Sequence, residues 1–317
     1  MTFAIEAEGI TKRFGDTHAL AGIDLAAREG SVLGVLGPNG AGKTTAVRIL
    51  ATLLRADSGR ATVAGFDVAR QPQQVRQQIG LTGQFASVDE DLTGIQNLVM
   101  IGQLLDMPTR DARRRAAELL DWFELDEAAD RVAKTYSGGM RRRLDLAASL
   151  VGRPAIVFLD EPTTGLDPAK REAMWDVVRR LVTDGSTVLL TTQYLEEADA
   201  LADEITVIDR GRVIAHDTPL GLKRTVGGQR LTVRPSDASR LSEVTALLGK
   251  VSGKQVETSG RDAASVAVDG DGALATTVGL LQSAGIAVTE LSLHLPSLDE
   301  VFFTLTGRPA DTSEEAA

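Results

Sequence analysis

A glycine-rich segment that ends in a lysine and two threonines has the residue types needed to bind phosphate groups. Residues 37–45 read Gly-Pro-Asn-Gly-Ala-Gly-Lys-Thr-Thr and fit the pattern G-x-x-x-x-G-K-[ST]. A loop of this kind turns so tightly that successive backbone N–H groups point at one centre and hold phosphate oxygens. We expect Lys43 to reach the β- and γ-phosphates of a nucleotide and the Thr44 hydroxyl to be a ligand of Mg²⁺. The candidate phosphate-binding residues are Gly37, Pro38, Asn39, Gly40, Ala41, Gly42, Lys43, Thr44 and Thr45.

Two adjacent acids have the chemistry to hold a metal ion and to accept a proton during hydrolysis. Asp160 and Glu161 directly follow the apolar residues 155–159. Acids at the carboxyl end of a buried parallel strand lie where ligands bind in open α/β sheets. We therefore expect Asp160 to hold Mg²⁺ and Glu161 to take the proton from the attacking water. The alternative is a strand end with two solvated acids.

Strands and helices alternate around these residues in a pattern that predicts an α/β fold. The apolar residues 32–36 before the glycine loop predict a strand, and residues 46–54 predict a helix whose positive N-terminal end adds to the phosphate site. This order disfavours a plain glycine turn before a buried helix. Residues 155–160 and 186–192 predict further buried strands, and Gln193 follows the second. Other strands are predicted at 2–8, 20–28, 61–64, 79–84, 204–209 and 212–216.

Three further features lie between these strands. From residue 92 to about residue 125, apolar residues recur at helical spacing, which predicts a helical subdomain over about residues 90–150. Tyr136-Ser-Gly-Gly-Met140 precedes a predicted helix over 141–151, so its glycines could present N–H groups to a second phosphate. Phe14, in a predicted loop between the first two strands, is a candidate platform for adenine, with an ordinary loop anchor as the alternative.

The composition indicates a globular protein of more than one domain. The chain has 317 residues, of which 43% are hydrophobic, a mean hydropathy of −0.02 and no cysteine. No apolar run approaches the ~18 residues of a membrane helix. The opening residues 1–8 carry acids where a secretory signal would be basic, so we expect a cytoplasmic protein. The net charge of −10 argues against binding the backbone of nucleic acid.

Taken together, the motifs resemble those of the ATP-binding subunits of ABC transporters. They are GPNGAGKTT at 37–45, Gln84, YSGGM at 136–140, IVFLDE at 156–161, GLD at 165–167 and Gln193, and the likeness covers roughly residues 3–225. The resemblance implies a P-loop ATPase that works as a head-to-tail homodimer. In such a dimer Ser137, Gly138 and Gly139 of one subunit complete the site built on Lys43 of the other. It also implies that Phe14 stacks on adenine, that Gln84 senses the γ-phosphate within the Mg²⁺ site and that Asp167 lines the dimer contact.

Two positions depart from the usual pattern of this family. Gln193 stands where the family usually has histidine, and Met140 stands where its signature usually ends in glutamine. A glutamine amide positions a water and bonds a phosphate oxygen, but it carries no proton charge near neutral pH. We therefore expect Glu161, Gln193 and Lys43 to be the catalytic residues, without a titrating group at position 193.

Two segments resemble one branch of the family in particular. Residues 189–199 and 295–302 are similar to the drug-resistance branch typified by daunorubicin-exporting ATPases. This resemblance implies that the transported molecule is a hydrophobic drug or a lipid and that the permease is a separate chain.

The residues after about 226 predict a second, smaller domain over 226–307. The predicted order of elements is β-α-β-β-α-β with a terminal helix over 298–305, which suggests a ferredoxin-like α+β sandwich. Residues 308–317 read as a disordered acidic tail. The segment has no glycine loop and no cluster of acids, so we expect a regulatory or dimer-stabilising role.

Three classes of function fit the motifs to different degrees. The favoured one is the ATP-hydrolysing subunit of an exporter, with ATP and Mg²⁺ as ligands, peripheral at the cytoplasmic face of the cell membrane, homodimeric and bound to a separate integral-membrane permease. The second is a non-transport ABC-type ATPase that acts on nucleic acid or ribosomes, but such proteins usually carry two ATP sites, a zinc-binding insert or a long coiled coil. The third is a regulatory module that binds nucleotide without hydrolysis, against which the pair Asp160 and Glu161 argues.

Overall fold

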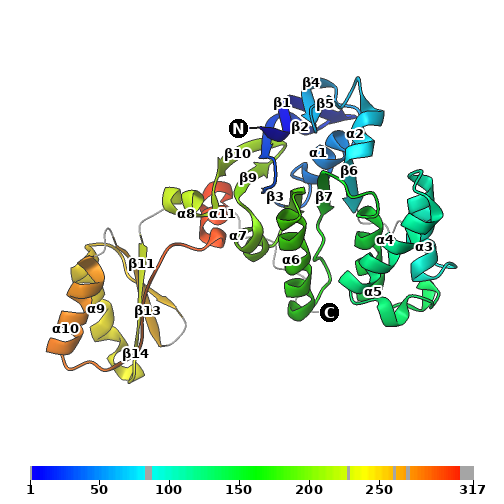
Figure 1. The fold of residues 1–317 in the computed structure, drawn as a ribbon. Coiled ribbons are helices and arrows are strands. Elements are labelled where there is room, and N and C mark those ends of the chain that lie inside the picture. The colour runs from blue at the N-terminus through cyan, green and yellow to red at the C-terminus, as the bar shows by residue number, and fades with distance from the viewer. Residues whose placement is uncertain (1, 83–87, 227–228, 260–261, 269–271, 308–317) are drawn as a thin grey trace. The chain divides into compact units, whose positions relative to one another are not determined.

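The computed structural model describes residues 2–82, 88–226, 229–259, 262–268 and 272–307, which form two compact units (Figure 1). One unit comprises Met1–Pro219 and the other Leu220–Pro309. The division falls at the start of helix α8, Pro219–Val226, whereas the sequence suggested a boundary after residue 225. The candidate site residues all precede this division, so the first unit is the one that positions the site.

The central sheet of the first unit confirms the predicted parallel strands. Its strands are β3, Val32–Leu36; β6, Ile79–Thr82; β7, Ile156–Asp160; β8, Thr187–Thr192; β9, Glu204–Asp209; and β10, Arg212–Asp217. Their order is β10-β9-β3-β8-β7-β6, in which β9, β3, β8, β7 and β6 run parallel and β10 pairs antiparallel with β9. The strands β3, β7 and β8 are buried along their whole length. Their carboxyl ends therefore meet at one edge of the sheet, where the glycine loop and the acids follow.

A second, antiparallel sheet covers the start of the chain. Its order is β2-β1-β4-β5, with β1, Phe3–Phe14; β2, Thr17–Arg28; β4, Ser58–Val63; and β5, Phe66–Asp67. The strands predicted at 2–8 and 20–28 were too short, because the pairing of β1 with β2 continues to Phe14 and Thr17. Phe14 therefore ends a strand instead of lying in a loop. Both sheets and helix α1 contribute to one core, which includes Ile5, Ile23, Leu33, Val47, Val63 and Phe158.

Seven α-helices of this unit are described. They are α1, Lys43–Leu50; α2, Pro72–Gln78; α3, Gly94–Leu104; α4, Thr109–Trp122; α5, Gly138–Ser149; α6, Pro168–Thr183; and α7, Leu195–Leu201. The helical subdomain groups α3, α4 and α5 at one side of the unit (Figure 1). The helical pattern predicted from residue 92 to about residue 125 forms two helices, which separate where Asp106 has a φ of 60° and Pro108 precedes α4. Two 3₁₀ helices, Asp126–Ala128 and Ala133–Thr135, connect α4 to α5.

The second unit contains the predicted β-α-β-β-α-β order. Its elements are β11, Gln229–Pro235; a 3₁₀ turn, Ala238–Arg240; α9, Leu241–Ser252; β12, Glu257–Ser259; β13, Ala263–Val268; α10, Gly272–Ser283; β14, Val288–His294; and α11, Leu298–Thr306. The sheet order is β12-β13-β11-β14 with antiparallel neighbours, as in a ferredoxin-like sandwich. Leu231, Val233, Val244, Leu248 and Val266 are among the residues of its separate core. No helix in the described parts of either unit has the length and apolar character needed to cross a membrane.

Candidate active site

The glycine loop connects β3 to α1 in a conformation that requires glycine at two positions. A Cβ atom at Gly37 would lie 2.2 Å from the carbonyl oxygen of Ile208. Gly42 has a φ of 113°, and a Cβ there would lie 2.5 Å from the carbonyl oxygen of Ala19. At Gly40, by contrast, a Cβ would meet nothing within 4 Å, so this part of the loop faces open space. The loop is thus held against β9 and β2 while its tip remains accessible.

The N-terminus of α1 has no side-chain cap and begins at the loop. Gly42 is its N-cap residue, and its carbonyl accepts the first helical bond from the N–H of Ala46 at 2.9 Å. The first N–H groups of a helix have no partner within the helix, and they attract anions together with the helix dipole. This geometry suits a phosphate group at the end of α1.

Lys43 brings a buried cation to the loop and to the predicted proton acceptor. Its side chain is 4% exposed, and Nζ donates to the carbonyl oxygens of Gly37 at 2.7 Å and Pro38 at 3.3 Å. Nζ also lies 3.4 Å from Oε1 of Glu161. One ion pair therefore joins the start of α1 to the residue that follows β7.

Thr44 and Asp160 form an oxygen donor set next to this ion pair. Thr44 Oγ1 donates to Asp160 Oδ1 at 3.2 Å, and Asp160 is buried. Hydroxyl and carboxylate oxygens suit a hard divalent cation such as Mg²⁺, which commonly takes one or two protein ligands besides phosphate oxygens. The described residues contain no group of three or more acidic, histidine or cysteine side chains that could hold a metal ion.

Glu161 has an unusual backbone conformation. Its φ is 51°, in the left-handed region that a residue with a side chain seldom adopts, at a cost on the order of 1–2 kcal/mol. Its N–H donates to Thr191 on β8, to the carbonyl oxygen at 3.0 Å and to Oγ1 at 3.1 Å. The neighbouring strand thus compensates for part of the strain and turns the Glu161 side chain toward Lys43.

Gln193 follows β8, the strand that lies between β3 and β7. Its side-chain oxygen is buried and has no hydrogen-bond partner among the described residues. A buried amide oxygen without a partner is costly and therefore suits a group that accepts a bond from a ligand or a water. The residue preceding it, Thr192, accepts a hydrogen bond from the N–H of Tyr194 at 2.9 Å, which fixes the backbone on both sides of Gln193.

The serine and two glycines predicted to meet a phosphate lie at the start of α5. Ser137 is the N-cap residue and accepts from the N–H of Met140 at 3.3 Å, so the helix begins at Gly138, three residues earlier than predicted. A Cβ at Gly138 would meet nothing within 4 Å, which leaves this helix start open. Tyr136 anchors the segment: its hydroxyl donates to the carbonyl of Ala128 at 2.7 Å, and burial raises the pKa of this phenol.

The structure places two of the remaining predicted site residues on other elements. The ring of Phe14 is 50% exposed, with Lys12 Nζ 5.6 Å from its centroid. Asp167 is the N-cap residue of α6 and accepts from the N–H of Lys170 at 3.0 Å. Hydrogen bonds from Lys170 hold the pKa of the Asp167 carboxyl below its usual value. Gln84 lies outside the described residues.

Three residues near the site were not singled out by the sequence. Thr191 is fully buried and donates from Oγ1 to Asp160 Oδ1 at 2.5 Å, so one hydroxyl contacts both acids of the strand end. In the sequence, Thr191 is marked only by its hydroxyl group in a strand with several aliphatic residues. Arg142 on α5 donates to backbone carbonyls of residues 160–162, which we call the acidic turn. In the sequence, Arg142 is one of three consecutive arginines, and nothing distinguishes it from the other two.

Glu197, on α7, is the third residue near the site that the sequence did not single out. It follows Gln193 by about one helical turn. Its carboxyl group is 1% exposed, and neither oxygen makes a well-formed hydrogen bond within the described residues. Burial raises the pKa of this carboxyl, although nearby Thr192, Thr163 and Trp175 oppose part of the increase. The only sign in the sequence that Glu197 lies near Gln193 is its position about one helical turn further along the chain.

Comparisons with known proteins agree on one family. The sequence profile described as ABC transporter matches residues 20–164. A daunorubicin resistance ATP-binding protein of Streptomyces coeruleorubidus is 56% identical, with 98% of each chain covered. A daunorubicin/doxorubicin resistance ATP-binding protein of Streptomyces peucetius is 52% identical, with 100% of this chain and 97% of that protein covered. The solved structure of an ATP-binding cassette, dimeric and bound to ADP and Pi, has a TM-score of 0.63 at 25% identity over 68% of this chain and 98% of its own.

Proposed function

Because the chain belongs to the ABC transporter family of ATP-binding proteins, we propose that it hydrolyses ATP to drive export of a hydrophobic drug or lipid through a separate membrane permease. The observation that carries this proposal is the convergence of Lys43, Thr44, Asp160 and Glu161 at the carboxyl edge of one parallel sheet. A phosphate loop, a cation, a metal donor set and a proton acceptor within direct contact of one another are the parts that nucleotide hydrolysis requires.

ATP binding rests on residues 37–45 and on Phe14. The backbone N–H groups of the loop and of the start of α1 would hold the phosphates, and Lys43 would supply the positive charge for the β- and γ-phosphates. The half-exposed ring of Phe14 would be the platform on which the adenine base stacks. Thr44 and Asp160 would hold Mg²⁺, and Gln84 is the third residue that we propose for this metal site. When bound, this ion neutralises charge on the phosphate oxygens.

Hydrolysis rests on Glu161 and Gln193. The carboxylate of Glu161 accepts a proton from the water whose oxygen bonds to the γ-phosphorus, while the bond from that phosphorus to the bridging oxygen of ADP breaks. The buried oxygen of Gln193 accepts a hydrogen bond and so orients this water. Lys43 holds the Glu161 side chain in place through their 3.4 Å contact.

A second copy of the chain would complete each site. The open space at Gly138, at the start of α5, supports a contact in which the N–H groups of Ser137, Gly138 and Gly139 would bind the ATP of a partner. Asp167, exposed at the start of α6, would line the contact between copies. The relative described as dimeric with ADP and Pi supports this arrangement. We therefore propose a homodimer at the cytoplasmic face of the membrane, bound to the permease.

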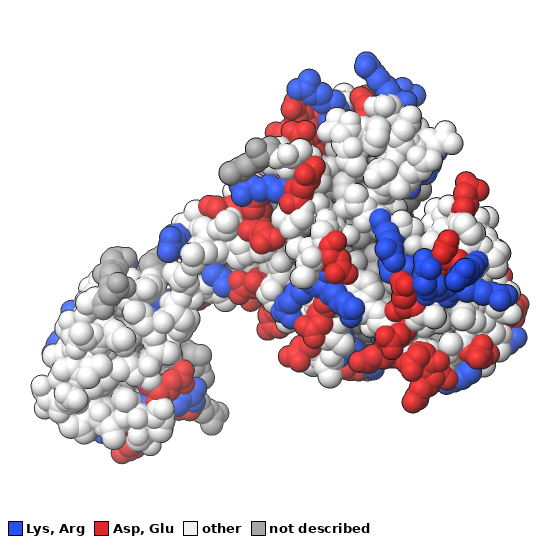
Figure 2. Space-filling view, in the orientation of Figure 1, with Lys and Arg blue, Asp and Glu red and all other residues white. Residues whose placement is uncertain are grey.

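Charge distribution favours the exporter over an ATPase that acts on nucleic acid or ribosomes. The chain carries 44 acidic and 34 basic residues. In the space-filling view, acidic and basic side chains alternate over the first unit, without a continuous basic surface on the face shown (Figure 2). Proteins that follow a phosphate backbone present such a surface.

The test replaces Glu161 by glutamine in the full-length chain. Glu161→Gln should retain ATP binding and lose at least about a hundredfold in turnover, because an amide cannot accept the proton. Glu172→Gln on the exposed face of α6 is the matched control and should hydrolyse ATP at the wild-type rate. In cells that also express the permease, wild type and control should lower accumulation of daunorubicin, and Glu161→Gln should not. Wild-type turnover by Glu161→Gln would refute the assignment of the base.

A further inference from the structure

The guanidinium group of Arg142 contacts three consecutive backbone carbonyls of the acidic turn. Arg142 lies in the second turn of α5, the helix that Ser137 caps. Its Nη2 donates to the carbonyl oxygens of Asp160 at 3.5 Å and Glu161 at 3.2 Å, and its Nε donates to that of Pro162 at 3.4 Å. One side chain of the helical subdomain is thus attached to the backbone of the proposed catalytic residue in the same chain.

These contacts act on the strained part of the turn. Glu161 has the left-handed φ of 51°, and its N–H is held by Thr191 from the side of the sheet. Arg142 holds the carbonyl of the same residue from the side of α5, so the peptide groups on both sides of the Glu161 Cα are fixed. A planar guanidinium can bind several acceptors at once in a fixed geometry, which a lysine cannot do.

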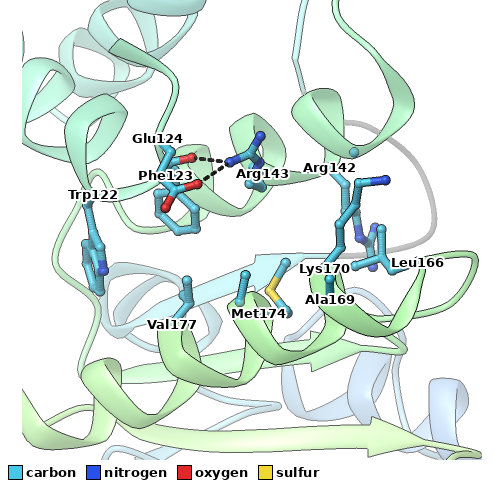
Figure 3. A pocket seen from close by; sticks show the side chains of 12 residues that line it. Trp122, Phe123, Glu124, Arg142, Arg143, Leu166, Ala169, Lys170, Met174 and Val177 are labelled. Atoms are coloured by element: carbon cyan, nitrogen blue, oxygen red, sulfur yellow. Dashed lines mark hydrogen bonds and ion pairs between the residues drawn. The ribbon is translucent and has the colours of Figure 1, made fainter. Parts of the chain in front are cut away.

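Apolar packing between α5 and α6 is incomplete near this bridge. A pocket of about 290 Å³ lies between the two helices and the end of α4 (Figure 3). Arg142 lies at one end of it, near Leu166 and Lys170, whereas Arg143 points to Glu124 at the other. Because side chains leave this space unfilled, apolar contacts between α5 and α6 are reduced here. The hydrogen bonds of Arg142 therefore contribute more to holding α5 against the acidic turn than they would in a fully packed interface.

We propose that Arg142 is a positioning residue that couples the two ATP sites of the dimer. This inference rests on the proposed function, in which Ser137 meets ATP held by the partner while Glu161 serves ATP held by its own Lys43. Ser137 caps α5 and Arg142 lies in its second turn, so a displacement of the helix start when it meets ATP moves the guanidinium. The displacement then reaches the backbone of Glu161, and ATP at one site thereby sets the geometry of the base at the other.

The first test compares Arg142→Gln with Arg143→Gln in the full-length protein. Arg143 is the matched control, since its Nη1 contacts lie within the helical subdomain, with the carbonyl of Phe123 at 2.9 Å and Glu124 Oε2 at 3.2 Å. Arg142→Gln should lower kcat about tenfold or more, leave the KM for ATP within about twofold and reduce the Hill coefficient for ATP toward 1. Arg142→Lys should recover only part of kcat. Unchanged kcat and cooperativity in Arg142→Gln, or an equal loss in Arg143→Gln, would overturn the proposal.

The second test places the substitution in a chosen chain of a mixed dimer. One chain carries Glu161→Gln, so that only the other chain has an active base. Arg142→Gln in the chain with the active base should reduce turnover about tenfold, whereas in the Glu161→Gln chain it should change turnover less than twofold. If turnover decreased only when Arg142→Gln was in the Glu161→Gln chain, Arg142 would act through residues 136–140 on the ATP of the other chain. That result would refute positioning of Glu161 by Arg142 of the same chain.

A measurement of dimerisation shows whether a negative result refutes this inference alone or the proposed function as well. Glu161→Gln alone and combined with Arg142→Gln should both dimerise with ATP and Mg²⁺, as measured by light scattering. If Glu161→Gln stays monomeric, the dimer itself is refuted, and the coupling falls with it. If only the double variant stays monomeric, Arg142 acts on assembly and the positioning role is refuted.

Discussion

Replacing Thr191 by valine removes two contacts from the site with almost no change in side-chain volume. The hydroxyl donates to Asp160 at 2.5 Å and accepts from the N–H of Glu161 at 3.1 Å. The N–H of Glu161 keeps its second acceptor, the Thr191 carbonyl at 3.0 Å. The main loss is therefore the bond to the buried carboxyl of Asp160, which retains the weaker contact from Thr44 at 3.2 Å.

The expected loss of stability follows from the charge and burial of these partners. A hydrogen bond to a charged group contributes about 1.5–3 kcal/mol, and an unsatisfied buried acceptor costs a similar amount. We expect Thr191→Val to lower the free energy of unfolding by about 2 kcal/mol, which for a domain of this size corresponds to a decrease in Tm of about 4–8 °C. Thermal unfolding followed by circular dichroism measures this decrease.

Activity distinguishes a site residue from an ordinary core threonine. With its hydroxyl removed, the turn that carries Asp160 and Glu161 is less constrained, and kcat should decrease about tenfold. Thr187→Val is the control, because Thr187 is buried at the other end of β8 and accepts from the N–H of Gly30 at 2.9 Å. It should lower Tm with unchanged kcat. Wild-type kcat in Thr191→Val, with a Tm loss like that of the control, would refute the reasoning.

Lys43→Ala should weaken ATP binding at least about a hundredfold, measured by fluorescent-nucleotide titration, because the site loses its buried cation; unchanged affinity would contradict this role. Gln193→Ala should lower kcat about a hundredfold with little change in ATP affinity, whereas Gln193→His should retain turnover and gain a step near pH 6.5; near-wild-type turnover in Gln193→Ala would show that the amide is dispensable. Ser137→Arg should block ATP-driven dimerisation in light scattering, and a normal dimer would remove Ser137 from the contact. Since burial raises the pKa of Glu197 above its ordinary 4.5, its contribution to stability is full below that pH and decreases as the pH rises through the folded pKa. Glu197→Gln should therefore gain in Tm relative to wild type from about pH 5 to about pH 8, and the exposed control Glu196→Gln should not; parallel curves for Glu197→Gln would refute the effect of burial.

The central strands and the ends of the parallel sheet could be predicted because their signals are local. Residues 32–36, 156–159 and 188–190 are unbroken runs without a polar side chain, as expected for strands buried on both faces. The glycine pattern specifies a loop whose backbone conformation excludes other residues, as the close approach of Gly37 to Ile208 illustrates. The elements of the second unit were likewise evident from alternating strand and helix periods.

Element limits were less predictable, because they depend on neighbouring chain segments. The hairpin of β1 and β2 continues to Phe14 since cross-strand pairing continues, and the residue types at 9–19 do not show this. The break between α3 and α4 depends on the left-handed backbone of Asp106, a conformation that few residues other than glycine signal.

By itself, the sequence determined that a phosphate loop, two acids and a polar residue each follow a buried strand, and parallel strands then require these residues to share one edge. Only the tertiary structure decided which atoms meet there. The left-handed backbone of Glu161, the shared hydroxyl of Thr191 and the reach of Arg142 from α5 join residues far apart in the chain. Such contacts depend on the distance and orientation between packed elements, and a one-dimensional pattern of residue types does not contain either quantity.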